Sequence, residues 1–406
     1  MVTRTGAHKA FRAGTHRTLP PDETLLRGLR FAPVMGITRI ANVTGLDTVG
    51  VPVVMVCRPN ARSLAVSQGK GLDLAAAKAS GLMESVEGYH AETITLPLRL
   101  GSYEELRYSH RVVDPTELPS VSTGMFHPNL RILWCEGHDL LNEEPVLVPY
   151  ELVHTDYTWP QPAGSGCFAS SSNGLASGNH LLEAISHGIC EVVERDSTTL
   201  WSFTDQAAHD SRQIDLASVD DPACGQVLEK FEHAGLTTDV WETTSDVGIA
   251  TFACVINEKD RDPMRLFPPA AGMGCHPARS IALLRALTEA AQSRLTHITG
   301  SRDDLGHDSY AQYRDPTIQG ADVLPATTRR FGDAPDWDSD TLDGDLDWEL
   351  GRLRGAGIKR VIAVDLTKEA FRVPVVRVII PGLEGLREVP GYIPGKRALA
   401  AATGAS

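Results

Sequence analysis

The sequence predicts a mixed fold of helices and sheets, of the α/β or α+β class, and three observations lead to that expectation. Segments with apolar residues every three or four positions alternate with short apolar runs of strand length. With 42% hydrophobic residues among 406, the chain can bury an extensive core. No apolar run reaches the roughly 18 residues that a membrane-spanning helix requires.

The charge balance bears on the class of partner. Lysine and arginine number 38 and aspartate and glutamate 52, which gives a net charge of −14. Binding to a phosphate backbone calls for a basic surface, so no nucleic acid partner is expected. The first 30 residues lack an apolar run of the length found in secretory signals, which predicts a cytoplasmic protein that does not associate with a membrane.

The first predicted elements are two strands and a helix. Ile37–Val43 and Val51–Cys57 are apolar runs joined by a glycine-containing turn, which predicts two consecutive strands. A loop is expected at Ser67–Gly71. The alanine-rich segment Leu74–Glu92 then favours a helix, with Asp73 as its N-cap.

Two more long helices are each expected after a glycine-containing turn. The first runs from His180 to Trp201 after the turn at 173–178, and the second from Ala278 to about Ile298 after the turn at 272–277. Shorter elements complete the pattern: helices at Ala217–Ala234 and Leu350–Gly355, and strands at Thr238–Glu242, Ile249–Ile256, Val361–Asp365 and Val375–Ile380.

Composition divides the chain into one large domain with two tails. Residues 31–390 form the expected domain, residues 1–30 an N-terminal tail and residues 391–406 a loosely held C-terminal tail. Within the domain, residues 301–347 are rich in Asp, Pro, Gly and Thr and predict a long inserted loop. Loops of that length usually cover a functional site or form a mobile connection.

Glutamates are concentrated on faces of the long predicted helices. Glu84 and Glu87 are three residues apart on the first helix. On the second, Glu183, Glu191 and Glu194 fall within an arc of about 80°, at ~100° per residue. Acids that converge repel one another, so a shared site would need a counter-charge such as Mg²⁺. The alternative is an ordinary solvated face paired with Lys and Arg.

The spacing of the cysteines and the absence of standard motifs exclude several other kinds of functional site. The seven cysteines are scattered without a C-x-x-C pair, which predicts mostly buried thiols rather than a zinc site or disulfides. The P-loop, H-E-x-x-H and G-x-S-x-G motifs are absent, and the glycines at 272 and 274 lack the third glycine of a dinucleotide fingerprint. His90, His180, His187 and His276 have no ligand-like companions and are expected to be structural.

One long motif is more specific. Ser171-Ser-Asn-Gly-Leu-Ala-Ser-Gly-Asn179 runs into Glu183-Ala-Ile-Ser-His-Gly-Ile-Cys-Glu-Val-Val-Glu-Arg-Asp196, and this block resembles the signature of the YcaO family. The resemblance extends over about residues 36–384. Four further segments occur in the expected order: Ser67–Gly71, Ser80–Glu87, Arg285–Glu289 and Pro381–Glu384.

The resemblance implies an α+β fold of the YcaO type, in which mixed or antiparallel sheets pack with long helices around a non-standard ATP site. Residues 31–390 would then be the YcaO catalytic domain. The Mg²⁺ ligands that it implies are Glu84, Glu87, Glu191, Glu194 and Glu289. The nucleotide contacts that it implies are Asn179, Glu183, Arg195 and Arg285, with Ser67, Lys70 and Ser80 in the neighbouring phosphate or ribose region.

One position departs from the family pattern. Many relatives have Glu-Arg where this chain reads Glu87-Gly88. One phosphate contact is therefore missing, and His90 and Glu92 are the candidates to serve that region.

The resemblance also implies a reaction. Family members like this one use ATP to phosphorylate the amide oxygen of a peptide bond in a ribosomally made precursor peptide, and a nucleophile then attacks the carbon as phosphate leaves. External sulfide gives a thioamide, whereas a neighbouring Cys, Ser or Thr side chain gives an azoline.

Three features favour thioamide formation with a TfuA-like partner protein. The chain leaves no room for a ThiF-like or peptide-recognition domain, its tail lacks a P-x-P-x-P ending, and Met35–Asp47 is most similar to TfuA-associated relatives. The alternative reaction is stand-alone azoline or macroamidine formation of the bottromycin type. The alternative class is a scaffold that binds a leader peptide without catalysis. A homodimer is expected because relatives often form one.

Overall fold

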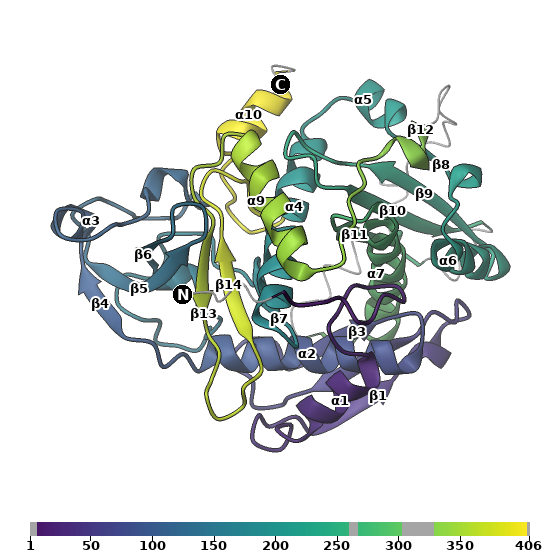
Figure 1. Cartoon of the computed structure of the whole chain (residues 1–406), viewed down its shortest axis with the longest axis horizontal. Coiled ribbons are helices and arrows are strands. Elements are labelled where there is room, and N and C mark those ends of the chain that lie inside the picture. The colour runs from purple at the N-terminus through teal and green to yellow at the C-terminus, as the bar shows by residue number, and fades with distance from the viewer. Residues whose placement is uncertain (1–5, 260–266, 303–328, 404–406) are drawn as a thin grey trace.

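The computed structural model describes residues 6–259, 267–302 and 329–403 (Figure 1). Its strands form a six-stranded sheet, two three-stranded sheets and one two-stranded pair. All pairings are antiparallel except that of the two-stranded pair, which is parallel. Long helices pack on these sheets, so the predicted α+β class is confirmed.

The helices are distributed along the whole chain: α1 (Pro21–Leu29), α2 (Leu74–Glu92), α3 (Tyr103–Leu106), α4 (Leu181–Ser202), α5 (Gln206–Ser211), α6 (Pro222–His233), α7 (Arg279–Thr299), α9 (Leu342–Gly355) and α10 (Lys396–Ala402). The strands between them are β1 (Arg39–Asn42), β2 (Val53–Cys57), β3 (Val66–Lys70), β4 (Leu98–Gly101), β5 (Ile132–Asp139), β6 (Glu144–Pro149), β7 (Leu175–Ser177), β8 (Ile214–Asp215), β9 (Leu236–Glu242), β10 (Thr251–Glu258), β11 (Ala270–Cys275), β12 (Arg329–Arg330), β13 (Ile362–Asp365) and β14 (Val375–Ile379).

The three long helices agree with the sequence prediction within one residue at each end. α2 begins after Asp73, whose side chain accepts a hydrogen bond from the backbone N–H of Ala76 at 2.8 Å. α4 begins after His180, whose ring accepts from the Leu182 N–H. α7 ends at Gly300, which adopts the left-handed conformation that glycine allows.

Two predicted connections are strands instead. Ser67–Gly71, expected as a loop, lies almost entirely in β3, and the expected turn at 272–277 lies mostly in β11. Glycines in these segments suggested turns, but there they allow strands to lie against helix backbone. The sequence analysis also missed β4 to β7, whose short apolar runs carry little periodicity.

The two three-stranded sheets have the same construction. β1, β2 and β3 form a meander covered by α2, and β9, β10 and β11 form another covered by α7. In both, glycines of the strand that precedes the helix face helix backbone. A Cβ built on Gly69 would lie 2.1 Å from the Ala77 carbonyl oxygen, and one on Gly272 would lie 2.2 Å from the Ala290 nitrogen. This contact brings the helices, and the acids they carry, close to the strands.

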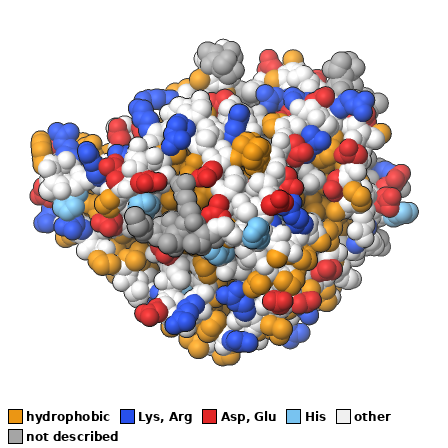
Figure 2. Space-filling model, viewed as in Figure 1, with side chains coloured by type: hydrophobic (Ala, Val, Ile, Leu, Met, Phe, Trp, Pro, Cys, Tyr) orange, Lys and Arg blue, Asp and Glu red, His pale blue; other side chains and the backbone are white. Residues whose placement is uncertain are grey.

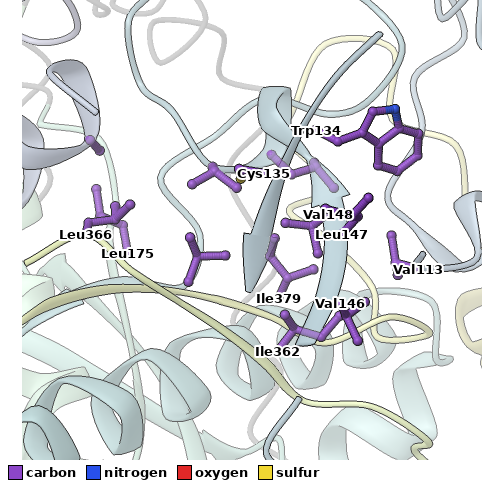
Figure 3. Close-up of a cluster of buried hydrophobic side chains, with 14 of the residues drawn as sticks. Val113, Trp134, Cys135, Val146, Leu147, Val148, Leu175, Ile362, Leu366 and Ile379 are labelled. Atoms are coloured by element: carbon purple, nitrogen blue, oxygen red, sulfur yellow. The ribbon is translucent and has the colours of Figure 1, made fainter. Parts of the chain in front are cut away.

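The six-stranded sheet has the order β4-β5-β13-β14-β7, with β6 paired to β5. Its largest core cluster includes the fully buried Trp134, whose indole N–H donates to the Gly101 carbonyl, together with Val148 and Ile362 (Figure 3). β7 and β14 lie against α4, which runs through the centre of the molecule between this sheet and β11 (Figure 1). α4 is therefore the element that the two halves share.

Both ends of the chain pack against this centre. Lys9 is buried and pairs with Asp345 at 2.5 Å. At the other end, Arg397 of α10 pairs with the buried Asp196 of α4. Of the loop predicted at 301–347, residues 303–328 lie outside the described residues; β12 and the start of α9 occupy part of the remainder.

The surface mixes both signs of charge. On the face shown in Figure 2, acidic and basic side chains are interspersed, with no large area of one colour. All seven cysteines are free, and all except Cys57 are buried. None of the helices in the described ranges is both long and apolar enough for a bilayer.

The close packing of β11 on α7 predicts a large effect of Gly272→Ala. The added Cβ would meet the Ala290 nitrogen at 2.2 Å and the Ala286 carbonyl oxygen at 2.3 Å, so strand and helix must separate. We expect a loss of about 3 kcal/mol in the free energy of unfolding, measured by urea denaturation. The control is Gly225→Ala within α6, where a Cβ meets nothing within 4 Å and a gain of about 0.5–1 kcal/mol is expected. Equal stability of the two variants would contradict this packing.

Candidate functional site

The five glutamates that the sequence analysis singled out as metal ligands come from three helices and interact with one another. Glu84 and Glu87 lie on α2, Glu191 and Glu194 on α4, and Glu289 on α7. Glu84 and Glu194 each interact electrostatically with Glu289, and Glu87 with Glu191. The acids therefore gather in one region, where the three helices face one another.

Burial raises the pKa of most of these acids. Desolvation raises the pKa of Glu87 to about 8, and hydrogen bonds from Ser177 only partly oppose it. Desolvation also raises the pKa of Glu194 to about 7 and that of Glu191 above its usual value, although Arg195 opposes both shifts. The positive charge around these carboxylates is too small to cancel the effect of desolvation on their pKa values.

Glu84 is the one of these five acids whose side chain is exposed to water. Desolvation by the surrounding protein nevertheless raises its pKa to about 7. An exposed side chain with a strong desolvation effect is expected where protein surrounds a group on several sides without covering it. Ser80, four residues earlier on the same helix face, is also exposed.

Two basic residues offset part of the negative charge. Lys70 of β3 pairs with Glu289 at 2.5 Å, and Lys70 and Arg195 together hold the pKa of Glu289 below its usual value despite desolvation. Arg195 lies 3.3 Å from Glu194. Burial alone would lower the pKa of Arg195, but Glu194 and its neighbouring acids raise it. β3 belongs to one three-stranded sheet, and α7 packs on the other. The Lys70–Glu289 pair therefore links these two parts of the structure at the site.

Residues with predicted nucleotide contacts form a second group, at the start of α4. Glu183 accepts hydrogen bonds from the Thr18 N–H and hydroxyl and from the Asn179 N–H. The Asn179 side chain donates to Thr24 of α1 at 2.8 Å. Glu183 thus points away from Glu191 and Glu194, although all three share one helix face in sequence terms.

Arg285 of α7 belongs to this second group. It donates to the Cys275 carbonyl at 3.0 Å and interacts electrostatically with Arg17 and His187. A small cavity beside it is lined by Arg17, Glu183, His187, Arg285 and their neighbours.

Sequence reasoning missed the contribution of the N-terminal segment. Arg17 is enclosed at the site, where desolvation lowers its pKa and Glu183 and Glu87 oppose that shift. Thr18, Thr24 and Arg27 contact Glu183 or Asn179. The only available signal was the prolines at 20 and 21, which fit a helix start. Nothing in the sequence pattern shows where that helix docks.

Ser67 differs in position from Lys70. Because side chains alternate along a strand, Ser67 shares the face of Gly69, which packs on α2, whereas Lys70 points to Glu289 of α7. No side-chain hydrogen bond of Ser67 is found among the described residues. A contact with the carboxylates is thus found for Lys70, whereas none is found for the Ser67 side chain among the described residues.

At Gly88, where the sequence departs from the family pattern, the side chain of Arg58 lies against the backbone. A Cβ on Gly88 would lie 2.9 Å from Nη2 of Arg58, so a guanidinium from the end of β2 occupies that space. Glu92 accepts both hydrogen bonds from Arg58, at 2.5 and 2.7 Å. His90 is buried, bonds to the Val86 carbonyl, and has its pKa lowered to about 4 by desolvation. His90 and Glu92 are therefore engaged within the protein, and Arg58 is the basic group beside Gly88.

The donor set suits a magnesium site that is completed by phosphate and water. Within the described ranges, no group of three or more His, Cys, Asp or Glu side chains is arranged to hold a metal ion by itself. Mg²⁺ commonly takes only one or two carboxylates and fills its remaining positions with phosphate oxygens and water. Five acids that repel one another, four of them with raised pKa values and Glu84 exposed to water, fit that requirement.

Comparisons with known proteins agree with this architecture. The family model described as YcaO cyclodehydratase, ATP- and Mg²⁺-binding, matches residues 68–384. A protein of Rhizobium leguminosarum bv. trifolii, described as an uncharacterized protein in the tfuA 3′ region, is 36% identical over 91% of this chain and 88% of its own length. An uncharacterized protein of Methanothermobacter thermautotrophicus is 36% identical over 90% of this chain and 94% of its own length.

Solved structures share the fold. YcaO from Methanopyrus kandleri, bound with AMPPCP and Mg²⁺, superposes with a TM-score of 0.72 at 25% identity, covering 96% of this chain and 99% of that protein. A heterocyclase in complex with substrate and cofactor gives a TM-score of 0.76 at 24% identity. That match covers 95% of this chain but only 54% of the heterocyclase, and the likeness concerns the fold alone.

The raised glutamate pKa values predict how the stability of the metal-free protein depends on pH. Burial raises the pKa values of Glu84, Glu87 and Glu194 to about 7 to 8, above the usual value of a glutamate, so the folded protein binds more protons than the unfolded chain between these values. Stability must then fall as pH rises from about 5 to 8. We expect the melting temperature to drop by several degrees over this range in EDTA.

Excess Mg²⁺ should reduce this drop, because a bound cation replaces the protons. Calorimetry with Mg²⁺ at pH 6 should also record proton release. A melting temperature that rises with pH in EDTA would contradict the assigned direction of the shifts.

Proposed function

Since the chain belongs to the YcaO family, a family described as binding ATP and Mg²⁺, we propose that it is an enzyme that activates a backbone amide of a ribosomally synthesised peptide. Activation consists of transfer of the γ-phosphoryl group of ATP to the amide oxygen. A nucleophile then adds to the amide carbon and phosphate leaves with that oxygen.

One observation carries this proposal: acids from three separate helices come together in one region with Lys70 and Arg195. Phosphoryl transfer needs little covalent chemistry from the protein, which positions the groups and neutralises charge. In this role the acids Glu84, Glu87, Glu191, Glu194 and Glu289 would hold Mg²⁺, which supplies charge neutralisation at the phosphates. Lys70 and Arg195 would meet phosphate oxygens directly.

The residues at the start of α4, together with Arg285, would bind the rest of the nucleotide. Asn179, Glu183 and Arg285 are the proposed contacts, and Arg17 is added to them because it lies between Glu183, Glu87 and Arg285. Thr18 and Thr24 hold Glu183 and Asn179 in place through hydrogen bonds. Ser67 and Ser80 stay proposals for the phosphate or ribose region, with Ser80 favoured by its exposed position near Glu84.

We favour thioamide formation, with sulfide as the nucleophile and a TfuA-like protein as partner. Support comes from the Rhizobium relative, whose description places it in a tfuA 3′ region. The alternative is azoline or macroamidine formation without such a partner, which the fold shared with the heterocyclase allows. A non-catalytic scaffold is less well supported, because a scaffold would not need a cluster of acids with raised pKa values.

The reaction is tested with purified protein, ATP, Mg²⁺, sulfide, a TfuA-like protein and the precursor peptide encoded beside the gene. We expect phosphate release and a peptide mass gain of about 16 Da for sulfur in place of oxygen, or a loss of about 18 Da if a side chain closes a ring. Binding of AMPPCP and Mg²⁺ by calorimetry separates an enzyme from a scaffold. Absence of both nucleotide binding and a mass change would refute the proposal.

Glu194→Gln should separate catalysis from folding. The amide has nearly the same shape, but it removes a charge that repels Glu191 and Glu289. We expect turnover to fall by about 10²–10³-fold, while the metal-free protein keeps or gains thermal stability at pH 8. The control is Glu232→Gln, which alters an exposed glutamate near the end of α6 and should change neither property. A fully active Glu194→Gln protein would exclude Glu194 from the site.

A further inference from the structure

Within the described residues, Arg377, His154 and Asn173 carry buried polar atoms that make no hydrogen bond. Arg377 of β14 is 2% exposed, and its Nε and Nη1 groups have no hydrogen-bond partner. His154 is 1% exposed, and its Nε2 has none. The Oδ1 of Asn173 is also buried without a partner. Buried polar groups in folded proteins are nearly always paired, so several such atoms in one place indicate a missing partner.

These atoms belong to one neighbourhood. Arg377 donates through Nη2 to the Ser171 carbonyl at 2.5 Å, and the backbone N–H of Asn173 donates to the Ser171 hydroxyl at 3.3 Å. His154 interacts electrostatically with Arg377. Three separate segments, at residues 154, 171–173 and 377, therefore converge on one place.

The protonation of His154 follows from its hydrogen bond. Its Nδ1 accepts from the Asp156 N–H at 3.2 Å, so the neutral ring carries its proton on Nε2. Burial lowers the pKa of His154 and keeps the ring neutral near neutral pH. The unused groups are thus N–H donors on His154 and Arg377, and an acceptor oxygen on Asn173.

This neighbourhood adjoins the carboxylates at a different point from the nucleotide group. Glu191 and Tyr157 both interact electrostatically with Arg377, and both oppose the desolvation that lowers the pKa of Arg377 to about 10. Arg285 instead interacts with Arg17, His187 and His276. Glu191 therefore has both Arg377 and Arg195 next to it. Glu183 and Arg285, the nucleotide contacts proposed at the start of α4, instead line the small cavity beside Arg17 and His187.

The mixture of donors and an acceptor narrows the choice of ligand. A phosphate group that carries no proton offers only acceptors and would leave Asn173 Oδ1 unpaired. A peptide group has a carbonyl for the donors of Arg377 and His154 and an N–H for Asn173. Two exposed aromatic residues stand beside the cluster along the chain, Tyr157 and Trp159, the latter 88% exposed. Exposed aromatic side chains of this kind commonly anchor peptides and protein partners.

We propose that Arg377, His154 and Asn173 form the subsite that binds the main chain of the peptide substrate next to Glu191. The inference rests on the proposed function and extends it by naming residues that position the peptide. The free atoms are shielded from water in this structure, so binding of the peptide requires the segments around them to move. The peptide carbonyl would then add to the hydrogen bond that Arg377 already makes with Ser171.

Because the contacts are to main-chain groups, peptides of any sequence are valid probes. We would use a set of acetylated hexapeptide amides that differ in their two central side chains, and measure binding by calorimetry and NMR in the presence of AMPPCP and Mg²⁺. Arg377→Lys keeps a positive charge beside Glu191 but removes the planar group of donors. We expect its peptide Kd to rise at least about tenfold, while its Kd for AMPPCP with Mg²⁺ changes less than about twofold.

Two further variants keep the test decisive if Arg377→Lys fails to fold. His154→Phe retains the ring that stacks on Tyr150 but lacks the Nε2 donor, and it should also weaken peptide binding selectively. Arg360→Lys is the control, since Arg360 precedes β13 and pairs with Asp139 and Glu144 rather than with a group of the proposed subsite, and its peptide binding should stay unchanged.

Three results would overturn the subsite. Unchanged peptide binding in Arg377→Lys and His154→Phe would mean that internal water satisfies these donors. An equal loss of peptide and nucleotide binding in Arg377→Lys would assign Arg377 to the carboxylate site. Failure of every peptide to bind the wild-type protein would exclude a main-chain site. Binding of AMPPCP and Mg²⁺ by the wild-type protein, measured in parallel, distinguishes these results from failure of the proposed function.

Discussion

The architecture around the site depends on one electrostatic constraint, the assembly of several partly desolvated carboxylates from different helices. Glu84, Glu87, Glu191 and Glu194 are all harder to ionise than in water, because burial and mutual repulsion disfavour their charged forms. Lys70 and Arg195 compensate only part of this charge. A fold that tolerates such an arrangement must hold the helices firmly by other means.

Those means are close backbone packing and a shared central helix. Glycines of β3 and β11 let each strand lie directly against the helix that follows it, which leaves no space for side chains between them. α4 packs against both β11 and β14 and so carries its acids into the space between the two halves. The terminal segments add to this support, since Thr18 fixes Glu183 and Arg397 pairs with Asp196 behind the site. The same contacts that stabilise the fold therefore position the charged groups.

Arginines from scattered segments pack near the helices that carry the acids. Arg58 occupies the space beside Gly88, Arg17 arrives from the N-terminal segment, and Arg377 comes from the last strand of the large sheet. Each lies near different acids: Glu92 for Arg58, Glu183 for Arg17 and Glu191 for Arg377. With nucleotide contacts proposed on one side of the acids and a peptide subsite on another, the arrangement suits a transfer between two substrates.

The sequence by itself determined the long helices, because apolar periodicity, alanine content and caps such as Asp73 are local properties. It also singled out the acids of α2 and α4, since spacing fixes which residues share a helix face. Only the tertiary structure decided which of them meet. Glu183 shares a face with Glu191 and Glu194 yet turns to Thr18, because the N-terminal segment docks there. The strand character of β3 and β11, and the places of Arg17, Arg58 and Arg377, likewise depend on contacts between residues far apart in the chain, which local pattern does not encode.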